Sequence, residues 1–181
     1  MRGEKTTTAK KPPLRPVDRT FIRAFQNYTP PADLTVSEWA EAHRVLSREN
    51  SAEAGPWRNA RTPYLVEIMD AFTDPKIKKL TVVASSQVGK SELELNIIGY
   101  IIDQDPGSIL YIQPTLDDAK KFSRLRIAPM IRDSATLRSK VADVKSRDSG
   151  NTMLQKSFPG GMLTIVGSNS ASGLASDPAK D

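Results

Sequence analysis

The residues best suited to chemistry are Gly89, Lys90 and Ser91, which follow a short apolar run that begins at Leu80. A phosphate-binding loop has a Gly, four unrestricted positions and then Gly-Lys-Ser or Gly-Lys-Thr. Ala84 stands where the first Gly would be, and every other position matches. Because Ala is also small where the preceding strand ends, the pattern predicts a loop that binds the phosphates of a nucleotide.

Each part of this loop has an expected role. Its backbone N–H groups surround phosphate oxygens, the Lys90 ammonium reaches the β- and γ-phosphates, and the Ser91 hydroxyl ligates Mg²⁺. A helix that begins near Lys90 adds its positive dipole end. The expected cofactors are therefore ATP and Mg²⁺. Lys90 is the expected catalytic residue, and the expected binding residues of the loop are Ala84, Ser85, Ser86, Gln87, Val88, Gly89, Lys90 and Ser91.

The alternative to a phosphate loop is an ordinary turn between a strand and a helix. The loop pattern requires a strand before it and a helix after it. Apolar residues suit a strand at 77–84 and a helix at about 90–103, and this context favours the phosphate loop.

Three further elements are expected downstream. The nearly all-apolar segment 108–113 is typical of a strand buried on both faces of a parallel sheet. Thr115 is a suitable N-cap for a helix that runs to a break at Pro129. Residues 151–166 have the pattern of a β-hairpin around Gly160-Gly161. This order of helices and strands predicts an α/β fold with a mainly parallel sheet.

Upstream of the loop, two helices are expected. The segment Thr35–Glu38 is a capping box that begins a helix through about Arg44. Residues 47–61 are polar and predict a long loop. Thr62 is then the expected cap of a second helix. The expected buried face of the first helix is Val36, Trp39, Ala40 and His43, and that of the second is Tyr64, Leu65, Ile68, Met69 and Phe72.

Composition excludes several classes of site. The 181 residues include no Cys and one His, which leaves no disulfide, no thiolate metal site and no imidazole cluster. The longest apolar run is far shorter than a membrane span, and we expect a cytosolic protein. Of the net charge of +5, residues 1–19 carry six basic and two acidic side chains, or +4. We expect this arm to be flexible, either as a nonspecific nucleic-acid contact or as a solvated tail, and residues 20–181 to form one domain.

Several motifs together resemble one family. They are Trp39, Gly55-Pro56-Trp57, Thr62-Pro63-Tyr64, the loop at 85–91, and Gln113-Pro114-Thr115. From about Phe21 to Gly173, the chain is similar to the N-terminal ATPase end of large terminase subunits from tailed phages of the lambda type.

The resemblance implies a P-loop NTPase-type three-layer sandwich whose ATP hydrolysis drives double-stranded DNA into a capsid. It also implies a phage or prophage origin, work in the host cytoplasm as a homo-oligomeric motor, and two partners: a small DNA-recognising subunit and the portal of the procapsid. Adenine would be held upstream of the loop, which indicates Trp57, Arg58 and Tyr64 as stacking candidates. The alternatives are that Trp57 anchors its own loop and that Tyr64 packs on the core.

The chain departs from the family pattern in three respects. We expect the family's nuclease domain to be absent, and the strand that carries the family's Asp-Glu pair would follow the region of Leu174–Asp181, so the sandwich is expected to be incomplete at its C-terminal end. Ser86 and Gln87 stand near the position where many packaging motors have an Arg; the alternatives are Arg124, Arg126 or another subunit. Because the acidic pair positions the attacking water, we expect this chain to hydrolyse ATP poorly. The alternative functions are a truncated, inactive remnant and another P-loop enzyme such as a helicase-like ATPase.

Overall fold

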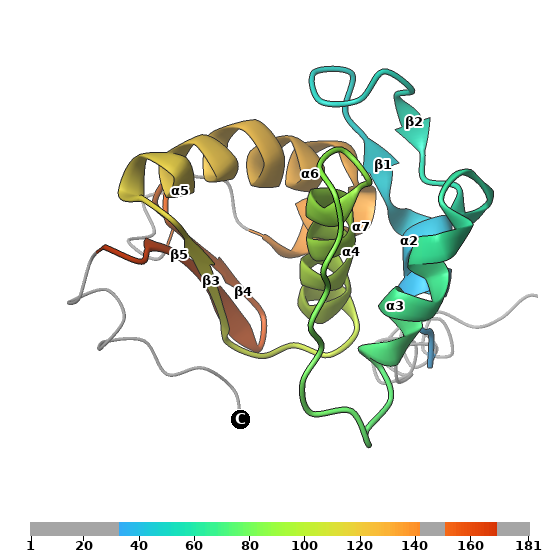
Figure 1. The fold of residues 1–181 in the computed structure, drawn as a ribbon. Helices are drawn as coiled ribbons and strands as arrows, with labels where there is room; N and C mark the ends of the chain where they lie inside the picture. The colour runs from blue at the N-terminus through green and yellow to red at the C-terminus, as the bar shows by residue number, and fades with distance from the viewer. Residues whose placement is uncertain (1–32, 142–150, 170–181) are drawn as a thin grey trace, which may run out of the picture. The chain divides into compact units, whose positions relative to one another are not determined.

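The computed structural model describes residues 33–141 and 151–169 of the 181-residue chain. These residues belong to one compact unit that contains helices and a three-stranded sheet (Figure 1). The predicted flexible arm at 1–19 and the boundary at residue 20 lie outside the described residues, as do Asp177 and Asp181. The described part is an α/β fold, as predicted.

The first helix confirms the predicted capping box. α2 (Val36–His43) begins after Thr35, whose hydroxyl accepts the N–H of Glu38 at 3.4 Å, and the Glu38 carboxylate accepts the N–H of Thr35 at 2.9 Å. Val36, Trp39 and Ala40 are fully buried on its inner face. The predicted buried face therefore forms as the periodicity indicated.

The segment between α2 and the predicted phosphate loop contains more short elements than predicted. Two short strands, β1 (Val45–Leu46) and β2 (Gly55–Pro56), pair antiparallel across the loop expected at 47–61. Two 3₁₀ turns (Asn59–Arg61 and Pro63–Leu65) then lead into α3 (Val66–Ala71). The prediction that Thr62 caps this helix is wrong, because its side chain makes no capping hydrogen bond.

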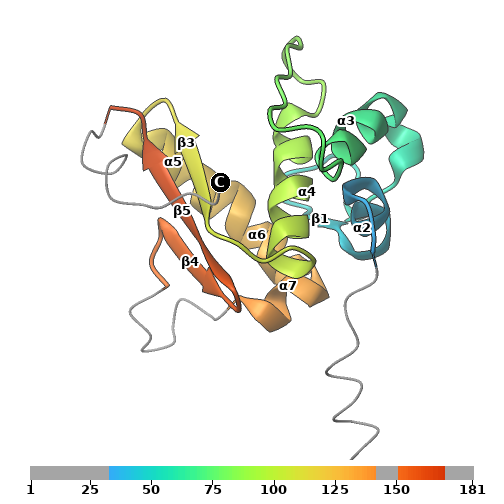
Figure 2. The ribbon, with the colours of Figure 1, turned by 90° about the horizontal axis from the view of Figure 1, so that it is seen from below.

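The central helix is α4 (Lys90–Asp103), which has the predicted bounds. Figure 2 shows it between the sheet with its helices on one side and α2 and α3 on the other. Trp39 of α2 packs on Gly99, where an added Cβ would lie only 2.2 Å from the indole ring. The indole N–H of Trp39 donates to the Asp103 carboxylate at 2.8 Å. Two residues of α4 thus fix the position of α2.

The sheet has the strand order β3-β5-β4. β3 (Ile109–Gln113) is parallel to β5 (Gly161–Gly167), and β4 (Gln155–Phe158) is antiparallel to β5. The predicted strand at 108–113 and the predicted hairpin are therefore confirmed. The prediction that this strand is buried on both faces is wrong, because Ile112 is 48% exposed and the rest of β3 is only partly buried. The described sheet has one parallel and one antiparallel pair, so it is mixed rather than mainly parallel.

One helical run follows β3 in the chain and extends from the sheet, where α5 packs on β5, to α4, where α7 packs. It consists of α5 (Leu116–Phe122), a π-helical turn (Ser123–Ile127), α6 (Ala128–Asp133) and α7 (Ala135–Lys140). Thr115 caps α5 by accepting the N–H of Asp118 at 3.1 Å, as predicted. The predicted break at Pro129 is wrong: Pro129 lies in the first turn of α6, where its missing N–H is tolerated.

The predicted strand at 77–84 is also wrong. In the described part of the chain, this segment is extended but pairs with no strand, and the Val83 side chain is 94% exposed. Apolar residues favour a strand locally, but a strand requires hydrogen-bonded neighbours, and none of the described strands supplies one.

Candidate nucleotide-binding site

The predicted phosphate loop connects the exposed segment 77–84 to the first turn of α4. Gly89 is the N-cap of α4 and has φ +84°, a left-handed conformation that favours glycine. A Cβ at Gly89 would also lie 3.2 Å from the Leu65 side chain. The turn before it contains Gln87, with φ +61°. The glycine at this position is thus required by both conformation and space.

Lys90 is folded back over the loop. Its ammonium group donates to the backbone carbonyl of Ala84 at 3.1 Å and to that of Ser85. The loop residues 84–87 and Ser91 are exposed. A cation at the positive end of a 14-residue helix, beside exposed backbone, makes an environment suited to an anion.

Two adjoining cavities open beside this loop. The first has a volume of about 250 Å³ and is lined by Gln87, Lys90, Ser91, Asn50 and Arg126, among others. The second has a volume of about 240 Å³, and Trp57, Arg58 and Arg61 contribute to its lining. Gly89 and Glu92 line both cavities. The start of α4 therefore joins a polar cavity to one partly lined by an aromatic ring.

The two aromatic candidates differ in burial and in their contacts with the loop. Trp57 is only 4% exposed, and its indole N–H donates to the Asn59 side chain at 2.7 Å, while the ring lines the second cavity. Tyr64 is 56% exposed, and its hydroxyl donates to the Val88 carbonyl at 3.4 Å. The expectation that Tyr64 belongs to a buried face is therefore wrong, as it is for the exposed Phe72, because the 3₁₀ turn rotates Tyr64 toward the loop.

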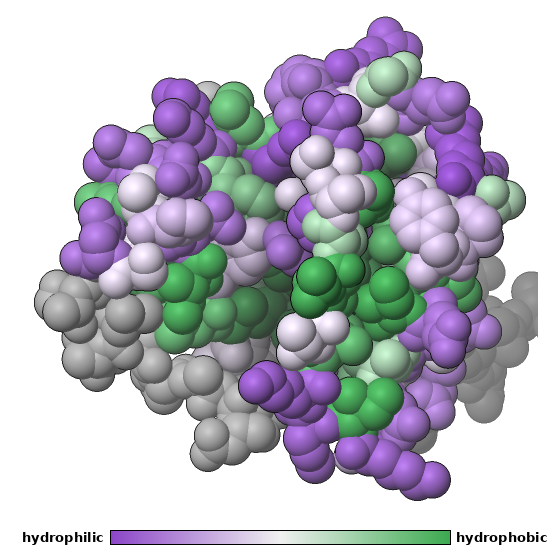
Figure 3. Space-filling model, in the orientation of Figure 1, coloured by the Kyte–Doolittle hydropathy of each residue, from purple (hydrophilic) through white to green (hydrophobic). Residues whose placement is uncertain are grey.

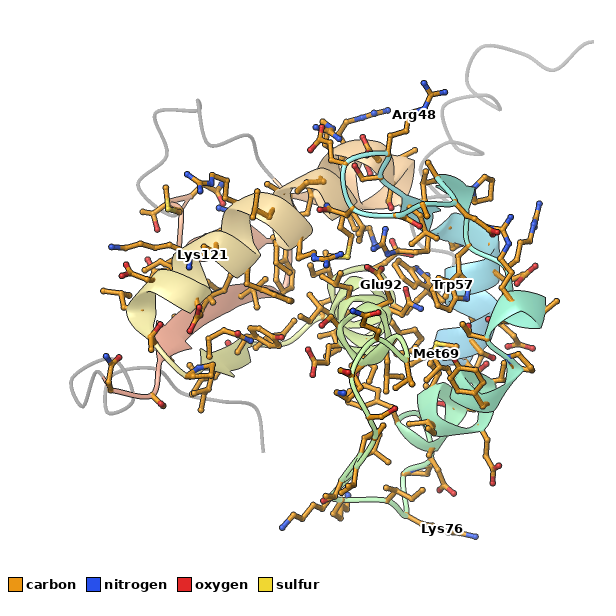
Figure 4. The ribbon with its side chains drawn as sticks, turned by 45° about the horizontal axis from the view of Figure 1, so that its top comes forward. Arg48, Trp57, Met69, Lys76, Glu92 and Lys121 are labelled. Atoms are coloured by element: carbon orange, nitrogen blue, oxygen red, sulfur yellow. The ribbon has the colours of Figure 1, made fainter. Side chains whose placement is uncertain are left out.

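An ion-pair network behind the loop was not predicted. The Glu92 carboxylate, in the first turn of α4, pairs with Arg44 at 3.0 Å and with Arg126 at 3.4 Å. Burial lowers the pKa of Arg44, and the nearby Glu92 carboxylate opposes this shift. Figure 4 shows Glu92 beside Trp57, at the meeting point of the two cavities. No local pattern indicates this network, because its members are far apart in the sequence.

Acidic side chains near the loop are already engaged. Glu92 pairs with two arginines, and Glu94 accepts a hydrogen bond from the Tyr111 hydroxyl at 2.6 Å. Burial and then this carboxylate raise the pKa of Tyr111, so the hydroxyl keeps its proton. Among the described residues, no three or more His, Asp or Glu side chains are grouped to hold a metal ion. The Ser91 hydroxyl, the predicted Mg²⁺ ligand, is exposed at the start of α4.

The described helices were also compared with the length and apolarity of a membrane span. None of those at residues 33–141 and 151–169 meets both requirements.

An α/β domain with a Gly-Lys-Ser loop at a helix N-terminus has the features of a nucleotide-binding protein. Residues 51–180 match the family described as phage terminase large subunit gpA, ATPase domain, and the chain belongs to this family.

Two curated relatives carry the same description. The chain is 31% identical to the "Terminase, large subunit" of Escherichia phage lambda over 144 residues, which is 79% of this chain and 22% of the relative. It is 28% identical to the "Terminase, large subunit" of Enterobacteria phage P21 over 132 residues, which is 73% of this chain and 20% of the relative. The chain thus spans about a fifth of the length of these proteins. The comparison with solved structures found no match.

Proposed function

We propose that this chain is the ATP-binding part of a phage or prophage DNA-packaging motor. The single observation that carries the proposal is the Gly89-Lys90-Ser91 loop at the N-terminus of α4, in a chain of the terminase ATPase family. The motor would act on double-stranded DNA in the host cytoplasm, together with a small terminase subunit, the portal of the procapsid and further copies of itself.

The loop residues fit a nucleotide triphosphate with Mg²⁺. Lys90 would exchange its contacts with the Ala84 and Ser85 carbonyls for phosphate oxygens. The N–H groups at the start of α4 would donate to the same anion, and the Ser91 hydroxyl would ligate Mg²⁺. Mg²⁺, when bound, supplies charge neutralisation at the phosphate oxygens.

The base would occupy the cavity partly lined by Trp57. Its ring is held by the hydrogen bond to Asn59, and the nearby Arg61 is paired with Glu53 at 2.9 Å. A rigid ring supplies an apolar surface at low entropic cost. Tyr64, whose hydroxyl donates to the Val88 carbonyl of the loop, is the second aromatic candidate for contact with the nucleotide.

The P-loop three-layer sandwich is proposed as the fold on two grounds, the α/β architecture and the loop that precedes α4. Segment 77–84 is not one of its strands in the described structure, where it is unpaired and exposes Ile77, Leu80 and Val83. The domain would comprise residues 20–181, with 1–19 as a basic arm.

Binding without efficient turnover is the second candidate function. Hydrolysis requires a group that orients the attacking water. The carboxylates of the first α4 turns, Glu92 and Glu94, are held by other side chains. This chain alone is therefore expected to bind ATP and hydrolyse it poorly.

The test is nucleotide binding by the full chain and its Lys90→Ala variant. Loss of one charge-assisted contact of about 1.5–3 kcal/mol weakens ATP binding by roughly 10- to 150-fold. Lys76→Ala is the matched control, because Lys76 is exposed and lies far from Glu92 in Figure 4. Equal affinity in Lys90→Ala and wild type would refute the loop assignment. Turnover in this chain and in one extended past Asp181 then separates the two candidate functions.

A further inference from the structure

We infer that Arg126 is a second cation of the phosphate site and that Glu92 positions it there. This inference rests on the proposed nucleotide binding and adds a residue that the loop pattern does not contain. Arg126 comes from the π-helical turn between α5 and α6, 35 positions beyond Ser91.

The first argument is location. Arg126 lines the same 250 Å³ cavity as Lys90 and Ser91. Arg124, two positions earlier in the same turn, is exposed and does not contribute to this lining. A π-helical turn inserts an extra residue into a helix and changes the direction of side chains, and such turns are frequent at functional sites. Of these two arginines, only Arg126 faces the loop.

The second argument is the unequal strength of the Glu92 ion pairs. Arg44 is buried and approaches Glu92 to 3.0 Å, whereas Arg126 has a 38% exposed side chain and lies at 3.4 Å. A buried Arg cannot give up its carboxylate without a large penalty, so Arg44 holds Glu92 in place. Arg126 can leave Glu92 at little cost, because a half-exposed ion pair contributes less than about 1 kcal/mol.

The third argument is charge. Glu92 neutralises one of the two arginines, so this group carries a net charge of +1 beside the Lys90 ammonium. A guanidinium has five N–H donors in a geometry that matches phosphate oxygens. Arg126 Nη1 donates to the Glu92 carboxylate and to the Asn50 carbonyl, and both acceptor oxygens lie 3.4 Å from this nitrogen. A phosphate in this cavity would give the guanidinium shorter, charge-assisted contacts.

The same contacts connect the two cavities. Asn50 belongs to the connection between β1 and β2, and the adjacent Ser51 lines both cavities. When Arg126 turns toward a phosphate, it leaves the Asn50 carbonyl. The Asn50 side chain also donates to the Leu125 carbonyl, so this segment stays attached to the turn that carries Arg126.

The test measures ADP affinity, with Mg²⁺, of the full chain and four variants. We expect about tenfold weaker binding in Arg126→Ala, a smaller loss in Arg126→Lys, and no change in Arg124→Ala, the matched control. Millimolar guanidinium should restore part of the affinity of Arg126→Ala and leave that of Lys90→Ala unchanged. A purely structural role for Arg126 would give no such rescue.

The outcomes separate the inference from the proposed function. Wild-type affinity in Arg126→Ala, an equal loss in Arg124→Ala, or absence of guanidinium rescue would overturn the role of Arg126 and leave the loop assignment intact. Equal binding by wild type and Lys90→Ala would overturn the loop assignment and this inference together. A thermal melt of each variant without nucleotide shows that the changes in affinity do not come from unfolding.

Discussion

The two segments that meet at the phosphate loop differ sharply in how they are held. After the loop, α4 is packed on several sides, and Leu93, Leu95, Ile98 and Ile102 are buried. Before the loop, 77–84 has no paired strand among the described residues and exposes Ile77, Leu80 and Val83. Figure 3, in the orientation of Figure 1, shows apolar side chains gathered at the surface in the middle of the face in view.

Because of this difference, the two halves of the loop are anchored with unequal firmness. The helix half has a fixed N-cap at Gly89 and a first turn anchored by the Arg44–Glu92 pair. The other half is attached through the hydrogen bonds of Lys90 to the Ala84 and Ser85 carbonyls. A hollow of about 450 Å³ separates parts of the segment from α4, lined by Leu80, Val82, Leu93 and Ile97 among others. The start of α4 is therefore the more firmly anchored half of the loop.

The strongest test of this contrast is Trp39→Ala, on the packed side. The indole ring is fully buried, contacts Gly99 and donates to Asp103. Its removal should lower the free energy of unfolding by about 4 kcal/mol. Urea denaturation followed by circular dichroism measures this change. A loss below about 1 kcal/mol would mean that α4 is not held by α2.

A smaller change in the free energy of unfolding is expected when the Asp103 carboxylate, at the end of α4, loses its charge. Burial raises the pKa of Asp103, but hydrogen bonds from Lys140, Gln104 and Trp39 outweigh it, and the pKa lies below its ordinary value. The folded state therefore gains stability above the ordinary Asp pKa of about 3.9, and this gain is lost as pH falls through the folded pKa.

The matched comparison for Asp103 is the Asp103→Asn variant. Its deficit in unfolding free energy relative to wild type should shrink as pH falls from 6 to 3. Urea denaturation across this range measures the deficit. A deficit that stays constant would show that the Asp103 carboxylate gains nothing from its partners.

The smallest effect is expected from Val83→Ala, on the exposed side. Because this side chain is 94% exposed, the free energy of unfolding should change by less than about 0.5 kcal/mol. Urea denaturation followed by circular dichroism measures this change. A loss above about 1 kcal/mol would show that the Val83 side chain is packed rather than exposed.

Much of the fold followed from local signals. The capping box at Thr35, the cap at Thr115, the bounds of α4 and the β4–β5 hairpin are all as predicted. Pro129 was misread because a proline that ends a regular helix is tolerated after a π-helical turn. Tyr64 was misread because a 3₁₀ turn, rather than an α-helix, begins at Pro63.

The sequence by itself determined the Gly-Lys-Ser loop, the helix that follows it and the family, because these depend on residues close together in the chain. The tertiary structure alone decided that Glu92 joins Arg44 and Arg126, partners 48 and 34 positions away. It also decided that 77–84 stays unpaired within the described part of the chain. The physical reason is the same in both cases: an ion pair and a strand each require a distant partner, which local sequence does not specify.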